Sequence, residues 1–373
     1  MNASADRLPS YALVADQEAQ RFAEVTQGGR YGLTEAEKSW KNRYSPLESR
    51  GYILRPRYRP GWSPSWLGTN LHPKFCEDSI MLNYYHVIDA IRKRDKTIVS
   101  LKIVPNDTDE VHMARFLTTP TLLQCPTNHC VPLLDILPDP LDGKMSLLVM
   151  PYLRPFDDPE FGAIGEVVDF MRQTLEGMCF LHGQQVAHRD CAAANIMMDA
   201  RPLYPKGHHP IRRNYSQDGV FDVTPLSRLD HPVRYYFIDF EISIRFPPGC
   251  STYVVGKKGR DKDVPELSFD IPYDAFKVDI FALGNLYDKE FLHKYCGLEV
   301  FQPLIDTMKD AQPSQRPTAD QALVLFEELC AHLNSPSLRW RLRSRTESAP
   351  ERVVYDTVAA AREGIYHLRR LIS

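Results

Sequence analysis

One stretch of the chain carries residue types at a spacing that suits phosphoryl transfer. It reads Val-Ala-His-Arg-Asp-Cys-Ala-Ala-Ala-Asn and ends at Asn195. In a loop that ends on a short strand, Asp190 can accept a proton from a hydroxyl group, while Asn195 holds a metal ion on nucleotide phosphates. These two side chains raise the question of which elements position them.

Several strands and a helix are expected before this stretch. Residues 87–91 and 97–104 are rich in β-branched side chains and flank a polar turn, which predicts a hairpin. Residues 109–117 are expected to form a helix, and residues 146–150 read as a buried strand. Residues 51–58 alternate like a strand and are expected to feed the same sheet.

The second half of the chain is predicted to be mainly helical. Apolar residues recur at helical spacing over 164–181, directly before the stretch, and further buried helices are expected at 276–286 and 317–333. Short apolar strands are expected at 196–198 and 235–238. The stretch is therefore expected to lie between a long helix and a short strand.

An insertion at 199–234 and a tail at 336–373 have no clear role in this pattern. The mixed charges and prolines of the insertion favour a solvated surface loop, with a loop that docks a substrate or partner as the alternative. In the tail, arginines surround Trp340 and precede a possible amphipathic helix at 351–371. A solvated helix packed on the domain is favoured over a nuclear-targeting or nucleic-acid patch. A regulatory partner would bind through either segment.

Taken in order, the segments from Val87 to Leu333 resemble the eukaryotic protein-kinase superfamily. Their texture is most similar to that of fungal kinase-like proteins with an extended N-terminus. The resemblance implies an α+β, two-lobed fold, with a small, mainly β N-lobe and a larger, mainly α C-lobe. The expected parts are an N-terminal extension at 1–45, the N-lobe at 46–153, the C-lobe at 154–335 with the insertion at 199–234, and a basic, partly helical tail at 336–373.

The resemblance implies a role for each residue of a catalytic set. Asp190 is expected to be the base that positions and deprotonates the acceptor hydroxyl. Asn195 and Asp239, the latter in a segment similar to Asp-Phe-Gly, are expected to be the metal ligands. Lys102 stands where kinases have the lysine of Val-Ala-Ile-Lys and is expected to pair with the α- and β-phosphates. Glu110, next to a second acid in the helix, is its expected partner.

The hinge between the lobes is expected to bind adenine. Met150, Pro151 and Leu153 resemble this hinge, where backbone groups contact the base. Asp157 is expected to reach the ribose, with an ordinary surface aspartate as the alternative. The full set of expected nucleotide-binding residues is Val87, Lys102, Glu110, Met150, Pro151, Leu153, Asp157 and Met197.

Buried charges support the resemblance in the second half of the chain. Val264-Pro265-Glu266 resembles Ala-Pro-Glu, and Arg316 lies where kinases place the partner of that glutamate. Asp279 lies where kinases have an aspartate that supports the catalytic loop from below. Because an unpaired buried charge is costly, these residues make sense only in a lobe built in this way.

The segment expected to cover the nucleotide phosphates departs from the kinase pattern. Ile80, Leu82 and Tyr85 stand where three glycines are expected, so backbone N–H groups would close less tightly over the phosphates. Glu241 replaces the glycine of Asp-Phe-Gly and adds a negative charge near the expected metal site.

The catalytic stretch departs from the pattern as well. Ala192 and Ala194 stand where kinases have Lys or Arg, which removes a cation for the transferring phosphoryl group unless another Lys or Arg supplies it. Gly259 replaces the threonine that is usual in serine/threonine kinases. The motifs therefore leave the acceptor class open, and serine or threonine is expected because these acceptors are the most common.

Composition bounds the compartment and the partners. With 373 residues and a formal net charge of −3, the chain is long enough for one large two-lobed domain, and nucleic-acid binding is not expected. Scattered cysteines and a start without an apolar signal segment indicate an intracellular protein, cytoplasmic or nuclear. No run approaches the roughly 18 apolar residues of a membrane span, so none is expected.

These features predict an ATP-dependent protein kinase, with ATP and Mg²⁺ as cofactors and a protein substrate. It would transfer the γ-phosphoryl group to a serine or threonine hydroxyl. The first alternative is a pseudokinase, an interaction module without catalysis, which the lost glycines and the alanines of the loop favour. The second is a kinase for a small-molecule hydroxyl, which the Ala-Pro-Glu-like segment and Arg316 disfavour.

Overall fold

The computed structural model describes residues 8–372, and the chain divides into two compact units. Unit 1 comprises the described residues of Met1–Asn106, Leu133–Tyr152 and Tyr204–Pro225. Unit 2 comprises those of Asp107–Pro132, Leu153–Leu203 and Leu226–Ser373. Unit 1 combines a sheet with helices and unit 2 is mainly helical, so the expected mixed α+β class is confirmed.

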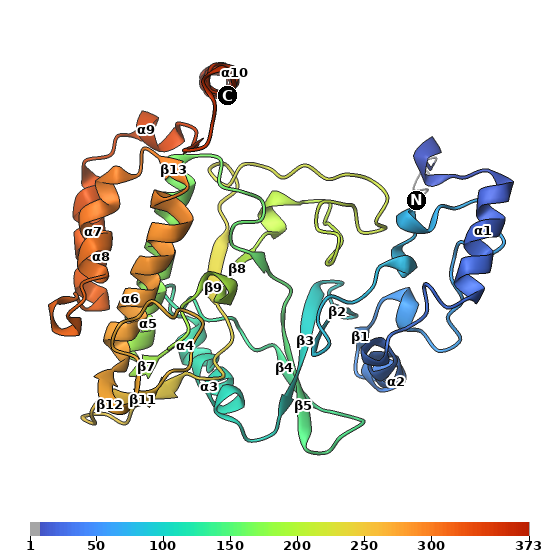
Figure 1. Ribbon diagram of the computed structural model, residues 1–373, viewed down its shortest axis with the longest axis horizontal. Coiled ribbons are helices and arrows are strands. Elements are labelled where there is room, and N and C mark those ends of the chain that lie inside the picture. Colours follow the sequence, from blue (N-terminus) through green and yellow to red (C-terminus); the bar gives the residue numbers. More distant parts are fainter. Residues whose placement is uncertain (1–7, 373) are drawn as a thin grey trace. The chain divides into compact units, whose positions relative to one another are not determined.

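Unit 1 is built on a five-stranded antiparallel sheet with the order β1-β2-β3-β5-β4 (Figure 1). The predicted hairpin and the strand at 146–150 are confirmed as β2, β3 and β5. Alternate residues of β3, Val99 and Leu101, are fully buried, because successive side chains of a strand point to opposite faces. The strands are β1 (Tyr52–Ile53), β2 (Val87–Arg92), β3 (Ile98–Pro105), β4 (Asp135–Pro138) and β5 (Met145–Pro151).

The strand expected at 51–58 is wrong beyond Ile53. Pro56 begins a short 3-10 helix, Pro56–Tyr58, because proline has a fixed φ and no N–H for a strand ladder. Arg57 and Tyr58 of this helix are fully buried. The alternating pattern therefore belongs to a short strand followed by a buried turn.

Two helices precede the sheet, α1 (Asp16–Gln27) and α2 (Glu35–Ser49). The sequence predicted only a polar extension here, although it carries the start signal of α2. Thr34 accepts a hydrogen bond from the Glu37 N–H at 3.2 Å, and Glu37 Oε2 accepts one from the Thr34 N–H at 3.0 Å. This reciprocal capping box fixes the beginning of α2.

The Glu37 carboxylate also anchors a buried polar network in unit 1. The side chains of Glu37 and Arg57 are both 0% exposed, and Arg57 Nε lies 2.7 Å from Glu37 Oε1. Burial opposes ionisation of Glu37, but hydrogen bonds and the charge of Arg57 hold its pKa below the usual value. The remaining Arg57 N–H groups donate to Glu37 Oε2 and to the carbonyls of Tyr31, Gly32 and Asp78. All five guanidinium N–H groups are thus satisfied.

Part of the insertion packs against other segments of unit 1. His209 is only 1% exposed, and its Nε2 lies 3.4 Å from Glu77 Oε1. The Tyr152 hydroxyl donates to the Pro210 carbonyl at 2.7 Å, and the Arg212 guanidinium donates to the Lys74 carbonyl. The prediction of a solvated surface loop is therefore wrong for these residues.

Unit 2 is mainly helical, as predicted. Long helix α5 packs against α8, and α6 packs against α7 (Figure 1). The helices predicted at 109–117, 164–181, 276–286, 317–333 and 351–371 are confirmed as α3, α5, α6, α8 and α10, with small differences at their ends. The helices are α3 (Asp109–Leu117), α4 (Pro120–Leu123), α5 (Ile164–Gly183), α6 (Ala275–Tyr287), α7 (Gln302–Met308), α8 (Ala319–Ala331), α9 (Ser335–Arg339) and α10 (Ala349–Ile372). Among the described residues, no helix is long and apolar enough to cross a membrane.

Short strands in unit 2 frame the stretch that contains Asp190 and Asn195. Strand β7 leads into it, β8 follows it, and β9 pairs with β8 and leads to Asp239. The sheets are β6-β8-β9, β7-β10, β11-β12 and β13-β14. Their strands are β6 (Arg154–Pro155), β7 (Val186–Ala187), β8 (Ile196–Asp199), β9 (Arg234–Phe237), β10 (Ile244–Arg245), β11 (Tyr253–Gly256), β12 (Ser268–Asp274), β13 (Tyr295–Cys296) and β14 (Arg343–Ser344).

A buried histidine makes the stability of unit 2 depend on pH. His129 lies 3% exposed beside β9, its Nδ1 is 2.8 Å from the Tyr235 carbonyl oxygen, and its Nε2 is 3.6 Å from Glu176. Burial lowers the pKa of His129 from 6.5 to about 4, and the nearby Arg234 charge acts in the same direction. Between these values the unfolded chain binds a proton that the folded chain does not, so stability falls as pH falls.

The expected loss attributable to His129 is roughly 3 kcal/mol between pH 7 and pH 4. A His129→Asn variant keeps a side-chain N–H for the Tyr235 carbonyl but does not titrate. Urea unfolding followed by circular dichroism should show a smaller loss for this variant than for the wild type. Equal pH dependence of the two proteins would exclude His129 as the cause.

Candidate functional site

Asp190 and Asn195 are joined directly in the loop between β7 and β8. The Asn195 side-chain amide donates to the Asp190 carbonyl at 3.0 Å and to Asp190 Oδ2 at 2.7 Å. Both amide protons of Asn195 are therefore engaged with Asp190. The oxygen Oδ1 is the atom that Asn195 can offer to a cation.

A histidine and an aspartate hold the backbone of this loop from within unit 2. His188 is fully buried, its Nδ1 accepts from the Asp190 N–H at 3.2 Å, and its Nε2 is 3.1 Å from the Ile238 carbonyl oxygen. Burial lowers the pKa of His188, which favours the neutral ring that this pattern requires. Asp279 on α6, also fully buried, accepts from the N–H groups of His188 at 2.8 Å and Arg189 at 2.6 Å. The predicted support from Asp279 is confirmed.

Asp239 lies two residues after the end of β9, next to a residue that contacts Asn195. The Ile238 N–H donates to the Asn195 carbonyl at 2.9 Å, which brings the next residue, Asp239, to the end of the loop. Asp239 and Arg189 have φ values of 65° and 67°, a left-handed conformation that non-glycine residues adopt at a cost of about 1–3 kcal/mol. Such conformations cluster at functional sites, which supports a role for this loop beyond packing.

Arg260 connects the two aspartates. Its backbone N–H donates to Asp190 Oδ1 at 2.6 Å. Its guanidinium Nε lies 3.4 Å from Asp190 Oδ2, and its Nη2 lies 3.8 Å from Asp239 Oδ2. The structure thus brings the predicted Asp190, Asn195 and Asp239 together, with a cation beside both carboxylates.

Gly259 allows this approach. Its φ is 102°, and a Cβ at this position would lie 2.7 Å from the Arg189 carbonyl oxygen. A larger residue would push the segment away from the loop, because both the conformation and the space require glycine. Glycine at position 259 therefore has a structural role, because it lets this segment approach the loop.

The predicted ion pair between Glu266 and Arg316 is present. Arg316 Nη1 and Nη2 lie 2.5 Å and 2.9 Å from the two carboxylate oxygens of Glu266. Arg316 is 0% exposed in its side chain and stacks over the Phe281 ring, 4.7 Å from its centroid. The bidentate geometry fixes the segment after Arg260 to the helical body of unit 2.

Unit 1 contains the residues expected to bind phosphates and adenine from the sheet. Val87 of β2 pairs directly with Lys102 of β3, and Lys102 pairs with Leu148 of β5. Met150 and Pro151 lie at the end of β5. The roles of these residues in nucleotide binding stay predictions.

The other expected nucleotide-binding residues belong to unit 2. Glu110 lies near the start of α3 and is 8% exposed, and Leu153 is 7% exposed. Asp157 is exposed in the loop after β6, and Met197 on β8 pairs with Tyr236 and Pro155. Their contacts with a nucleotide likewise stay predictions.

The segment from Ile80 to Tyr85, which has no glycines, is held by side chains from residues 37–55 of unit 1. The Ile80 carbonyl accepts from Arg55 at 2.8 Å, and the Leu82 N–H lies 3.4 Å from Glu37 Oε1. The Tyr85 carbonyl accepts from the Trp40 indole at 3.0 Å. The backbone groups at these positions are therefore fixed on side chains of the N-terminal region.

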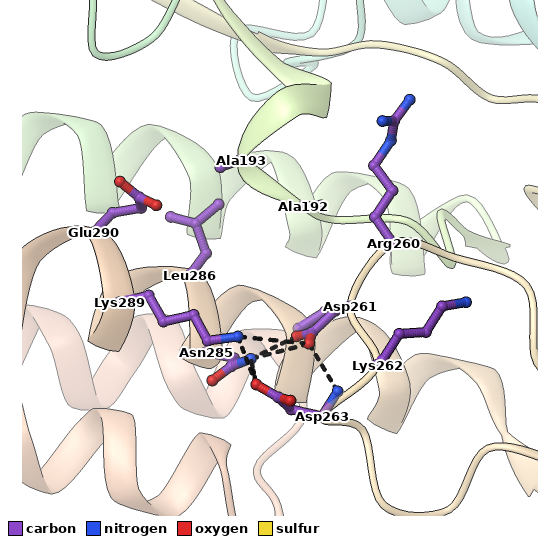
Figure 2. Close-up of a pocket in the computed structure, with 11 residues that line it drawn as sticks. Ala192, Ala193, Arg260, Asp261, Lys262, Asp263, Asn285, Leu286, Lys289 and Glu290 are labelled. Atoms are coloured by element: carbon purple, nitrogen blue, oxygen red, sulfur yellow. Dashed lines mark hydrogen bonds and ion pairs between the residues drawn. The ribbon is translucent and has the colours of Figure 1, made fainter.

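A cavity of about 330 Å³ lies beside the alanines of the loop between Asp190 and Asn195. Its walls include Ala192, Ala193 and Arg260 (Figure 2). Figure 2 also shows a cluster on the opposite wall, in which Asn285 donates to Asp261 and Lys289 pairs with Asp263. The cavity is bordered by charges of both signs and by the two small side chains of the loop.

Sequence reasoning did not identify Arg260 as part of the site. The alanines at 192 and 194 indicate that another Lys or Arg could supply the missing cation, and Gly259 directly precedes Arg260 in the sequence. The contact with Asp190 joins residues that are distant in sequence, so no local pattern reports it. In the described residues, no group of three or more His, Cys, Asp and Glu residues could hold a metal ion.

Comparison with known proteins gives one short similarity to a kinase. Over 53 residues the chain is 40% identical to protein-tyrosine kinase 6 of Mus musculus, a segment that covers 14% of this chain and 12% of that protein. No protein-family model matches the chain. The similarity gives a segment of the chain a kinase-like character and does not extend to the whole of either protein.

Proposed function

We propose that the protein is an ATP-dependent protein kinase that transfers the γ-phosphoryl group of Mg·ATP to a hydroxyl group of a protein substrate. The observation that carries this proposal is the convergence of Asp190, Asn195 and Asp239 at one place, with Arg260 beside both carboxylates. The short similarity to a protein-tyrosine kinase points in the same direction.

Asp190 is the proposed base. Its carboxylate is held by the Asn195 amide and by the Arg260 N–H, so its oxygens keep a fixed direction. A side chain positioned in this way can accept the proton of an acceptor hydroxyl as the oxygen attacks phosphorus. Asn195 therefore acts in part by orienting Asp190.

Asn195 and Asp239 fit a magnesium ion. They offer one amide oxygen and one carboxylate, which are hard oxygen ligands, and Mg²⁺ commonly takes one or two carboxylates together with phosphate oxygens. When bound, Mg²⁺ would neutralise charge on the phosphates of ATP. The sequence resemblance adds further residues to the proposal. Lys102, with Glu110 as its partner, would bind the phosphates, and the hinge residues would bind adenine. Serine or threonine is the proposed acceptor, and the similarity to a tyrosine kinase makes tyrosine the acceptor to compare.

A pseudokinase is the second candidate, and one observation favours it. Glu37 accepts from the Leu82 N–H, and Arg55 and Trp40 donate to the carbonyls of Ile80 and Tyr85, so the protein itself holds this segment in place. A segment fixed in this way is less able to wrap the phosphates with its N–H groups. As a pseudokinase, the chain would bind partner proteins through its surface and would not catalyse phosphoryl transfer.

Nucleotide binding and phosphoryl transfer measured on the same preparation separate the two candidates. The kinase predicts Mg²⁺-dependent ATP binding by calorimetry, weakened in Lys102→Met, and transfer to serine, threonine or tyrosine peptides. Exposed Lys258 provides a matched control, and Lys258→Met should bind ATP like the wild type. Lack of ATP binding, or ATP binding without phosphoryl transfer, would contradict the kinase function and favour the pseudokinase.

A further inference from the structure

Arg260 lies beside the two aspartates of the candidate site, and the contacts of its guanidinium with them are long. Its guanidinium lies 3.4 Å from Asp190 and 3.8 Å from Asp239, whereas a tight charge-assisted hydrogen bond spans about 2.7–2.9 Å. The side chain is 57% exposed. It can therefore turn towards a ligand without breaking a buried contact.

The backbone fixes where this side chain begins. The Arg260 N–H donates to Asp190 Oδ1 at 2.6 Å, so the proposed base itself holds the residue. Gly259 makes the approach possible, because a Cβ there would collide with the Arg189 carbonyl. The guanidinium is thus tied to the neighbourhood of the base through its own main chain.

The position of Arg260 matches the cation that the catalytic loop lacks. Ala192 and Arg260 line the same cavity, and the lysine of related kinases is expected at position 192. Figure 2 shows Arg260 extending away from the cluster of Asp261, Asp263, Asn285 and Lys289. The positive charge that is absent at Ala192 is therefore present nearby, on Arg260.

Two other cations that line this cavity are engaged elsewhere. Lys289 Nζ lies 2.5 Å from Asp263, on the opposite wall. Lys262 Nζ donates to the carbonyls of Lys257 at 3.1 Å and Gly259 at 2.6 Å. Of these three cations, Arg260 contacts the carboxylates of Asp190 and Asp239 and is therefore the one placed to reach a phosphate bound there.

We propose that Arg260 contacts the transferring γ-phosphoryl group and replaces the missing cation of the catalytic loop, an inference that rests on the proposed kinase function. The acceptor oxygen forms a bond to the γ-phosphorus while the bond from that phosphorus to the β,γ-bridging oxygen breaks. The hydroxyl proton goes to Asp190, and the electron pair of the broken bond leaves on ADP. The guanidinium stabilises the negative charge of the phosphoryl oxygens during this transfer.

Removing the guanidinium tests the inference. Arg260→Ala keeps the backbone N–H to Asp190, and kcat is expected to fall about 10²-fold with a smaller change in the KM for a peptide acceptor. Arg260→Lys should retain part of the activity. The matched control is Lys258→Ala, which removes an exposed cation of the same segment and should leave kcat within about twofold of the wild-type value.

Equilibrium binding gives a readout that is independent of turnover. Arg260→Ala should weaken binding of an ATP analogue with a non-hydrolysable β,γ linkage by about tenfold, because it removes a charge-assisted contact with the γ-phosphate. Its affinity for ADP, which lacks that group, should change little. A purely structural role would weaken both ligands equally and would overturn the inference.

Moving the charge provides the second test. Ala192→Lys, introduced together with Arg260→Ala, places a cation on the same cavity from the loop side and should recover at least about tenfold of the lost kcat. Transfer by the wild type with unchanged kcat in Arg260→Ala would overturn this inference alone. Absence of transfer by the wild type would overturn the proposed function, and the inference with it.

Discussion

Asp190→Asn is expected to lower the rate of phosphoryl transfer about 10³-fold, the largest effect on activity that we expect from a single substitution. The variant loses the proton acceptor. It also loses one of two hydrogen bonds, because the oxygens of Asp190 accept from the Asn195 amide at 2.7 Å and from the Arg260 N–H at 2.6 Å. An asparagine side chain has one oxygen and can satisfy only one of them.

Single-turnover transfer at saturating Mg·ATP measures this effect without interference from product release. Asp270→Asn is the matched control, since Asp270 is an exposed aspartate on β12, and it should transfer at the wild-type rate. Melting curves of both variants show whether they remain folded. Asp270→Asn should melt like the wild type, and Asp190→Asn should lose only about 1 kcal/mol of stability, because its side chain, 11% exposed, loses one hydrogen bond. Transfer by Asp190→Asn at the wild-type rate would rule out Asp190 as the base.

Arg57→Met is expected to destabilise unit 1 by about 3–5 kcal/mol, the largest effect on stability that we expect. Glu37 and Arg57 are both 0% exposed, so the substitution leaves a buried carboxylate without its counter-charge. The carbonyls of Tyr31, Gly32 and Asp78 lose their donors as well. Methionine fills much of the same space, so the loss comes from charge and hydrogen bonding rather than from a cavity.

Tryptophan fluorescence during urea unfolding reports mainly on this unit, because it contains three of the four tryptophans, Trp40, Trp62 and Trp66. The double variant Glu37→Leu with Arg57→Met should be more stable than Arg57→Met alone, since it no longer buries an unpaired charge. Lys38→Met, which breaks an exposed ion pair with Glu35, is the control and should change stability by less than about 0.5 kcal/mol. A similar small change in Arg57→Met would contradict the buried network.

The sequence predicted the parts of the molecule whose signals are local. The helical spacing over 164–181 became α5, and the β-branched runs around the turn at 92–96 became β2 and β3. Asp190 and Asn195 meet because a short loop between two strands leaves them few alternatives. Asp279 and the ion pair of Glu266 with Arg316 could be predicted because a known family pattern supplied the long-range pairing.

Contacts without such a pattern were missed. Alternation at 51–58 predicted a strand, but Pro56 ends it and the buried side chains serve the network around Glu37. Mixed charges at 199–234 predicted a solvated loop, but His209 within it is buried beside Glu77. Arg260 reaches Asp190 only because Gly259 permits the approach, and this depends on tertiary structure.

The most direct test of the central claim is the fate of the γ-phosphate when purified wild-type protein is given Mg·ATP and a mixture of serine, threonine and tyrosine peptides. We expect Mg²⁺-dependent phosphorylation of a peptide hydroxyl, with one ADP formed for each phosphate transferred, and its loss in Asp190→Asn. Binding of Mg·ATP with no phosphate transferred to any peptide or to the protein itself would contradict it.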